Sequence, residues 1–242
     1  MNPSTPFNGL RVAVTGGTSG LGLALVRALH AAGAQVAFVA RDAARVAGLA
    51  KELRGSHGIV GDVADKNDTH RIALQINGAL GGLDVLVNNA SSLGPVPPAL
   101  LADTECEDFE AALATNLLGP FRLTKALLGA LAASAREHIP ARAALVVNIT
   151  SDAAVNAYER WGAYGASKAT LAHLGRIWHE ELHAHDVHVL AFDPGDMDTP
   201  LHAAALPDAD PATLKRPADA ARELLALIAF TTSPRTAARA PA

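Results

Sequence analysis

The chain has 242 residues, half of them hydrophobic, and 24 acidic against 20 basic residues give it a formal net charge of −4. This composition excludes a disordered chain and offers no basic excess for a nucleic-acid surface, and the single cysteine, Cys106, excludes an intramolecular disulfide and a cysteine-rich zinc module. Because no apolar run reaches the ~18 residues of a membrane span and no apolar signal segment follows Met1, we expect a cytoplasmic protein without a membrane partner.

Short apolar runs alternate along the chain with longer segments in which apolar residues recur at helical spacing. Runs typical of buried strands lie at residues 10–15, 35–40, 59–60, 85–88, 144–149 and 187–192. Helices are expected at 21–32 and 42–54, helical stretches of 15 or more residues in most of the gaps, and a loop or short helix pair at 201–216. The alternation predicts an α/β fold, a single doubly wound parallel sheet with helices on both faces.

A glycine-rich turn, TGGTSGLG at residues 15–22, joins the first predicted strand to the first predicted helix. Glycines at such a turn let the backbone approach a pyrophosphate closely, and the helix N-terminus offers unpaired N–H groups and a partial positive charge to the anion. The position of the turn between a strand and an amphipathic helix favours dinucleotide binding. The predicted contacts from this turn are Gly16, Thr18, Ser19, Gly20, Leu21 and Gly22.

Further short motifs follow the glycine-rich turn in chain order. They are Asp62-Val63, Asn88-Asn89-Ala90, Asn116, Ser151, Tyr164-Gly165-Ala166-Ser167-Lys168, Pro194-Gly195 and Thr199. Together with the turn, they resemble the short-chain dehydrogenase/reductase family in its compact single-domain form, over about residues 8–230, with an irregular tail at 231–242. The resemblance implies a Rossmann-like fold and an NAD(P)-dependent oxidoreductase that acts on a carbonyl or alcohol substrate.

Tyr164 and Lys168 are four positions apart, which puts both side chains on one face of a helix. A tyrosine pKa near ~10 is too high for efficient acid–base catalysis at neutral pH, but a nearby ammonium and the nicotinamide ring favour the phenolate and lower that pKa. The resemblance implies that Tyr164 exchanges a proton with the substrate oxygen, that Ser151 hydrogen-bonds this oxygen and that Lys168 holds the nicotinamide ribose. It also implies that Asn116 binds a water linking Lys168 to solvent.

The resemblance also assigns the rest of the cofactor site. Asp62 and Val63 are expected at the adenine. The other expected contacts are Asn89, Ala90, Tyr164, Lys168, Pro194, Gly195 and Thr199.

The residues after the second predicted strand bear on the choice between NADP and NAD. An acidic side chain there binds a free 2′-hydroxyl and repels a 2′-phosphate. In the family's frame, Ala40 occupies the position where NAD users carry Asp, and Arg41 the position from which NADP users bind the phosphate, which the guanidinium fork suits. Asp42 could turn in or pair with Arg41, and Ser19 is neutral where some NADP users place a second basic residue. We favour NADP and keep NAD as the alternative.

Two other functions are compatible with the sequence, and two of its segments depart from the family pattern. The alternatives are an NAD-dependent alcohol dehydrogenase of the same family and a nucleotide-sensing regulator that retains the fold, although such regulators typically lose the Tyr or the Lys. Ser91 follows Ala90 where the family usually has Gly, so the backbone beside the cofactor is in question. The family's final strand is not evident after residues 228–230, which makes a seventh strand doubtful.

The His-Glu-x-x-His pattern at residues 179–183 is typical of zinc proteases. It continues the helix that is predicted to carry Tyr164, and His179 would lie roughly 22 Å beyond that tyrosine. We therefore expect no metal site.

The substrate and the assembly are less defined by the sequence. Segments 91–98, 152–161 and 196–210 are expected to wall the substrate pocket, but nothing identifies the ketone or alcohol. The predicted helices at 105–133 and 161–185 carry apolar residues on more than one side, whereas a helix packed only on a sheet needs one stripe. We predict a homodimer through these helices, with a homotetramer as the alternative.

Overall fold

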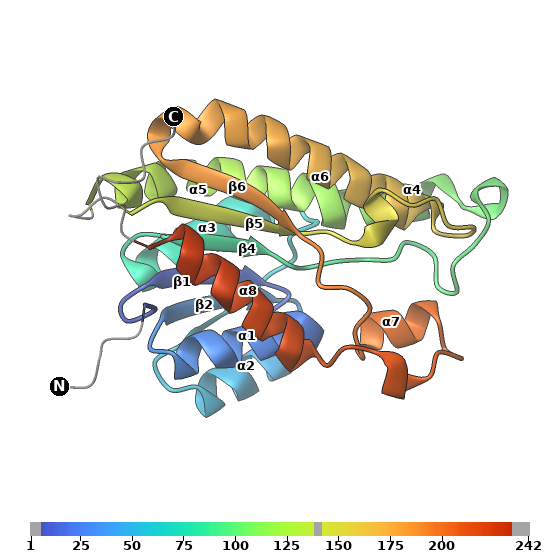
Figure 1. The fold of residues 1–242 in the computed structure, drawn as a ribbon, viewed down its shortest axis with the longest axis horizontal. Helices are drawn as coiled ribbons and strands as arrows, with labels where there is room; N and C mark the ends of the chain where they lie inside the picture. Colours follow the sequence, from blue (N-terminus) through green and yellow to red (C-terminus); the bar gives the residue numbers. More distant parts are fainter. Residues whose placement is uncertain (1–5, 138–141, 234–242) are drawn as a thin grey trace.

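The computed structural model describes residues 6–137 and 142–233, and a six-stranded parallel sheet lies at its centre (Figure 1). The strands lie in the order β3-β2-β1-β4-β5-β6. Their bounds are β1 (Arg11–Thr15), β2 (Gln35–Ala40), β3 (His57–Val60), β4 (Val85–Asn88), β5 (Ala144–Ile149) and β6 (Val187–Phe192). The chain winds outward from β1 to β3 and then returns to β4 on the other side of β1, so the order reverses between β1 and β4, where such sheets bind their ligands.

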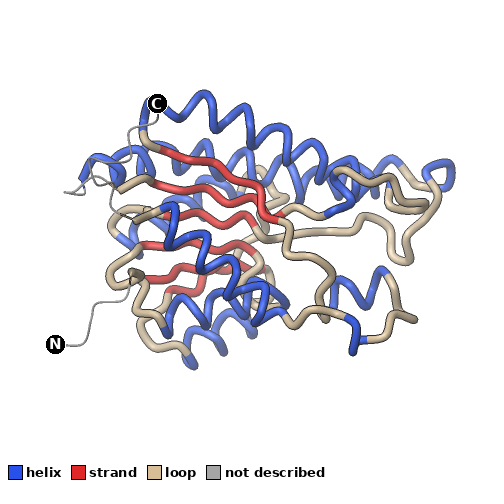
Figure 2. The backbone as a smooth tube through the Cα atoms, viewed as in Figure 1, coloured by secondary structure: helices blue, strands red, loops and turns tan. Residues whose placement is uncertain are grey.

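Helices cover both faces of the sheet, as the blue segments on either side of the red strands in Figure 2 show. One hydrophobic layer joins the sheet to α1, α2 and α8, and the other joins it to α3, α5 and α6. Their bounds are α1 (Gly20–Ala31), α2 (Ala43–Glu52), α3 (Asp68–Leu80), α4 (Cys106–Leu113), α5 (Gly119–Glu137), α6 (Gly162–Leu182), α7 (Pro200–Ala205) and α8 (Pro217–Thr231). The predicted fold class, a single doubly wound parallel sheet, is confirmed.

Alternate side chains of the central strand supply the two layers. Val12 and Val14 belong to the layer with α1 and α8, and Ala13 belongs to the layer with α3 and α5. Each of these side chains is 0% exposed, which explains why the strand is an unbroken apolar run rather than an alternating one. Full burial of a Val or Leu side chain stabilises a fold by about 1.5–3 kcal/mol.

The element lengths differ from the prediction in three places. Helix α1 has the 12 residues expected of it, shifted by one position, and α2 ends two residues before the predicted end, whereas α3, with 13 residues, falls short of the 15 or more expected in most of the other gaps. Strand β3 begins two residues earlier than predicted because His57 and Gly58 pair with Ala37 and Phe38 of β2 although neither is apolar. The segment predicted as a loop or short helix pair holds α7 and a 3₁₀ turn, Pro211–Thr213.

The C-terminal part of the described chain is helical where a final strand was in doubt. Residues 228–230 lie within α8, which packs on α1, and the sheet of the described residues has six strands. Residues 234–242 of the predicted tail lie outside the described residues, and the assignment of 8–230 to one domain stays a prediction. In the described part of the chain, no helix has both the length and the apolar character needed to cross a bilayer.

Candidate active site

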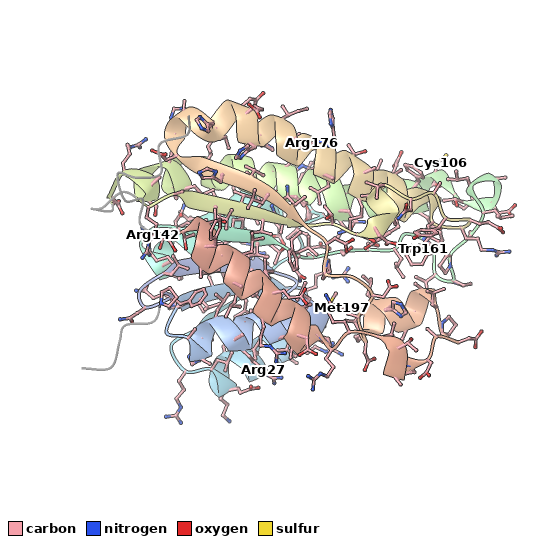
Figure 3. All side chains as sticks on the ribbon, in the orientation of Figure 1. Arg27, Cys106, Arg142, Trp161, Arg176 and Met197 are labelled. Carbon is pink, nitrogen blue, oxygen red and sulfur yellow. The ribbon has the colours of Figure 1, made fainter. Side chains whose placement is uncertain are left out.

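A cleft of about 1460 Å³ opens at the carboxyl ends of the strands, between the sheet and α7. Its walls are the loops that follow β1, β2, β3, β4, β5 and β6, the end of the molecule where Figure 3 labels Trp161 and Met197. The predicted site residues that line it are Gly16, Thr18, Ser19, Gly20, Leu21, Arg41, Asp62, Val63, Asn89, Ala90, Ser151, Tyr164, Lys168, Pro194, Gly195 and Thr199. Two predicted residues, Gly22 and Asn116, do not line the cleft.

The glycine-rich turn has the geometry of a phosphate cradle. Gly16 has φ +67°, and a Cβ there would lie 2.9 Å from Asn89 Nδ2, so a side chain fits neither the backbone nor the space. Within the described residues, the N-cap Ser19 makes no side-chain hydrogen bond to the first turn of α1. The N–H groups at that terminus can therefore bind an anion, which fits the pyrophosphate of a dinucleotide.

Gly22 does not line the cleft but packs against the outer side of the glycine-rich turn. A Cβ at this position would lie 2.2 Å from the carbonyl oxygen of Gly16. The glycine thus lets α1 pack directly on the turn, and any side chain would push the two apart.

Thr15, which the sequence analysis did not assign to the site, ties the turn to the loop after β4. Its buried hydroxyl accepts hydrogen bonds from the backbone N–H groups of Asn89 (2.9 Å) and Ala90 (3.0 Å). The Asn89 side chain donates in return to the Thr15 carbonyl at 2.8 Å. The two loops at the switch point therefore hold each other in place. A buried hydroxyl at the end of an apolar strand is the signal that could have identified it.

The end of β2 presents two arginines to the cleft, Arg41 and Arg45. The Asp42 carboxylate accepts a hydrogen bond from Arg45 N at 3.0 Å as the N-cap of α2, and its other oxygen lies 3.5 Å from Arg45 Nε. Asp42 is thus engaged with Arg45 and not with Arg41, which has no ion pair within the described part of the chain. Arg45 was missed because it follows the strand by a helical turn.

Tyr164 and Lys168 come from the first two turns of α6, and Ser151 comes from the end of β5. Tyr164 is 8% exposed and Lys168 is 2% exposed. The Lys168 ammonium donates to the carbonyl oxygen of Ile149 at 2.8 Å and lies 5.5 Å from the centre of the Tyr164 ring. Burial lowers the pKa of Lys168 to about 8.

The direction of the Tyr164 pKa differs from the sequence-based expectation. Burial raises this pKa above its ordinary value, and hydrogen bonds with the hydroxyls of Ser151 and Ser91 oppose the rise. Removing the phenolate from water outweighs these contacts, and the lowering expected from the nicotinamide ring together with Lys168 stays a prediction for the enzyme with its cofactor bound. Ser91, noted in the sequence as a departure from glycine, is thus a second hydroxyl beside the tyrosine.

Asn116 lies in a π-helical turn, Ala114–Leu118, between α4 and α5, and it is fully buried. Its oxygen accepts from Ser92 N (2.8 Å) and from Ser91 Oγ (3.3 Å). Its amide donates to Ser92 O (2.7 Å) and to Ser167 Oγ (2.8 Å). The side chain therefore fastens the loop after β4 to α6, with both its donors and its acceptor engaged, and its role as a water ligand stays a prediction.

The three segments expected to wall the substrate pocket all contribute to the cleft. Leu93, Ala153 and Ala205 form an apolar cluster with Tyr164, against which Trp161 and Leu201 pack. The rings of Trp161 and Tyr164 meet edge to face with centroids 5.6 Å apart. The hydroxyl of Tyr158 donates to Asp152 Oδ2 at 2.6 Å.

The histidines of the zinc-protease pattern lie outside the cleft. The ring of His179 is centred 6.5 Å from that of His183 and 5.3 Å from that of His188, and His179 Nδ1 accepts from Val189 N at 3.3 Å. Among residues 6–137 and 142–233, no group of three or more His, Cys, Asp or Glu side chains is arranged to hold a metal ion.

Comparison with known proteins places this geometry in context. The family model described as short chain dehydrogenase matches residues 11–210. L-fucose dehydrogenase of Mus musculus is 33% identical over 198 residues, covering 81% of this chain and 68% of that protein. A short chain dehydrogenase of Burkholderia cenocepacia in complex with NADP is 26% identical with a TM-score of 0.78, covering 92% of this chain and 91% of the other. A 3-ketoacyl-(acyl-carrier-protein) reductase of Brucella melitensis complexed with NADH, 24% identical, shares the fold with a TM-score of 0.84 and the same coverage, 92% and 91%.

Proposed function

The chain belongs to the short-chain dehydrogenase/reductase family and is an NAD(P)-dependent oxidoreductase, and on that premise we propose that it interconverts a carbonyl compound and an alcohol with NADP(H), using Tyr164 as the general acid and base. The observation that carries the proposal is that Ser151, Tyr164 and Lys168 line the same cleft as the glycine-rich turn. A proton donor and a dinucleotide cradle in one cleft are what carbonyl reduction requires.

Each of these side chains has a distinct task in the proposed mechanism. NADP(H), when bound, supplies or accepts the hydride. During reduction the Tyr164 hydroxyl gives its proton to the substrate oxygen, and during oxidation the phenolate takes it back. The Ser151 hydroxyl donates to the same oxygen and orients the carbonyl. The buried Lys168 ammonium favours the phenolate once a proton has left, which is the state that burial otherwise disfavours.

The preference for NADP rests on the end of β2. Arg41 lines the cleft without an ion pair in the described part of the chain, Arg45 lies beside it, and Asp42 is held by Arg45. Two guanidinium groups there suit a 2′-phosphate, and the relative that binds NADP supports the same choice. NAD is the alternative, since another relative binds NADH.

The proposed activity is tested by incubating the protein with NADPH or NADH and a panel of ketones and aldehydes. We expect reduced-nicotinamide absorbance to fall only when a carbonyl compound is present, and faster with NADPH. The control reaction omits the carbonyl compound. Bound NADPH that stays reduced with every carbonyl, together with no reduction of NADP⁺ by the corresponding alcohols, would contradict the proposal.

We also propose a homodimer through α5 and α6. Leu118 and Ile177, next to and within these helices, are 39% and 43% exposed, although Leu127, Leu171 and others of the predicted stripe are buried within the chain. Apolar side chains left exposed on two adjacent helices favour a two-fold contact. Light scattering at micromolar concentration is expected to give the mass of two chains, and a monomer would contradict the proposal.

A further inference from the structure

The charges that line the cleft are unevenly distributed. At the end beside β2, where the adenosine half of the cofactor is expected, Arg41 and Arg45 are accompanied by the carboxylates of Asp42 and Asp62. The end beyond Tyr164 is lined by three carboxylates, Asp152, Asp193 and Asp196. Among the described residues that line the cleft, Lys168 is the one further lysine or arginine besides Arg41 and Arg45, and it is buried next to Tyr164.

The negative field of this end reaches the reacting centre. The charges of Asp193 and Asp152 both raise the pKa of Tyr164, because they disfavour the phenolate. The same field opposes any anionic group that a substrate would bring next to Tyr164, and it favours a cationic one.

An apolar surface adjoins Tyr164 at this end of the cleft. Leu93 and Ala205 are buried beside Tyr164, and Trp161 and Leu201 pack against them. Such a wall binds an apolar group of the substrate, and an aromatic ring close to it attracts a cation through its face.

His202 of α7 adds a polar atom to the same end of the cleft. Its side chain is 11% exposed, and its Nδ1 is buried without a hydrogen-bond partner in the described structure. Nε2 lies 3.9 Å from Asp196 Oδ1, which is beyond hydrogen-bond distance, so the ring lies beside this carboxylate without being bonded to it.

From this combination, and resting on the proposed function, we propose that the substrate is an apolar carbonyl compound, or its alcohol, that carries no anionic group and is bound more tightly when it carries a positive charge. Keto acids and phosphorylated carbonyl compounds are excluded from this class by the carboxylates at the substrate end.

The experiment compares three acetophenones that differ in one meta substituent: a trimethylammonium group, a methoxy group and a carboxylate. With NADPH at saturation, we expect kcat/KM to be highest for the cation and at least about tenfold lower for the carboxylate, a difference that shrinks as salt is added. A carboxylate that is reduced as well as the cation would overturn the inference.

The double variant Asp193→Asn with Asp196→Asn should bring the cation and carboxylate within a few-fold of each other. Asparagine at 193 can still accept the hydrogen bond that Gly195 N gives to Asp193. The matched control is Asp208→Asn, an exposed carboxylate of the same segment that does not line the cleft, and it should keep the wild-type ratio. An unchanged ratio in the double variant would contradict the assignment of the field to these carboxylates.

A binding measurement separates this inference from the proposed function. Phenyltrimethylammonium, anisole and benzoate are titrated into the NADP⁺ complex while tryptophan fluorescence is followed, since Trp161 lines the cleft. We expect the same order of affinity, with benzoate weakest by about tenfold or more. Failure to reduce any acetophenone with this order intact would count against the proposed activity alone. Benzoate binding as tightly as the cation would overturn the inference whether or not turnover is seen.

Discussion

The cofactor end and the substrate end of the cleft are built from different parts of the chain. At the cofactor end, the backbone of the glycine-rich turn and the N-terminus of α1 form the surface, and Gly16 and Gly22 occupy positions that no side chain fits. At the substrate end, side chains from loops and from the short helix α7 form the surface. A site formed by the backbone requires glycine at particular positions, and such a requirement can be recognised in the sequence. A site formed by side chains depends on how separate loops pack together, which the sequence does not reveal.

The largest effect is expected from removal of the Tyr164 hydroxyl, which lies where the cofactor end and the substrate end of the cleft meet. We expect Tyr164→Phe to lower kcat by about 10²–10⁴-fold, because a general acid is lost, and to leave the Kd for NADPH nearly unchanged. The chain has one other tyrosine, Tyr158, whose hydroxyl also lies in the cleft wall. Tyr158→Phe should cost less than tenfold, and a Tyr164→Phe variant with normal kcat would remove Tyr164 from the mechanism.

The burial of the Lys168 ammonium between the cofactor end and the substrate end of the cleft lowers the free energy of unfolding at neutral pH. Burial lowers its pKa from 10.5 to about 8, so the unfolded chain binds this proton more tightly than the folded protein does. The free energy of unfolding therefore rises with pH between about 8 and 10.5, and the buried charge costs stability below that window.

Relative to Lys168→Met, the wild type should gain up to about 3 kcal/mol across that pH window. Urea unfolding at a series of pH values measures the difference, in which the titration of all other groups cancels. Parallel stability curves for the two proteins would show that the lysine is not buried as described.

The cofactor end is tested separately by Arg41→Ala. A charge-assisted hydrogen bond contributes about 1.5–3 kcal/mol, so the ratio of NADPH to NADH affinity should fall by about 10–150-fold. Arg176→Ala on the outer side of α6, labelled in Figure 3 away from the cleft, is the matched control and should keep the wild-type ratio. Equal affinity of the wild type for both cofactors would contradict the proposed preference for NADP.

The smallest effect on activity is expected from substitutions outside the cleft. His179→Ala combined with His183→Ala should leave kcat/KM within twofold of the wild type. Because Val189 N loses the ring nitrogen that accepts its hydrogen bond, unfolding should become easier by about 1 kcal/mol. Stoichiometric zinc in the wild type, with activity lost on chelation, would contradict this account.

Periodicity located most of the strands and the first two helices to within two residues, and it found only half of the edge strand β3. Residues 35–40, 85–88, 144–149 and 187–192 are strands as predicted, and β4 and β5, in the interior of the sheet, are buried along their whole length. Only residues 59–60 of β3 were expected, since this strand lies at the sheet edge and carries polar and small residues. Helix α3 is shorter than the 15 or more residues expected because Gly81, in a left-handed conformation, ends it.

The candidate site divides in the same way. The glycine-rich turn was predicted from its place between a strand and a helix, and Tyr164 and Lys168 were predicted from the family resemblance. All of them line the cleft except Thr15, Gly17 and Gly22 of the turn. The engagement of Asp42 by Arg45, and the contact of Ser91 with both Asn116 and Tyr164, were not, because they depend on side-chain directions across separate loops. The raised pKa of Tyr164 was missed for a related reason, since burial depends on how completely those loops close over the ring.

The most direct test of the central claim is to follow the label from NADPH deuterated at both C4 positions into the product of a ketone that the protein reduces. We predict an alcohol with one deuterium on the carbinol carbon from the wild type, and a rate of labelling lower by about 10²–10⁴-fold from Tyr164→Phe. Product without deuterium would contradict direct hydride transfer. Labelled product formed at the wild-type rate by Tyr164→Phe would contradict the role of this tyrosine as the proton donor.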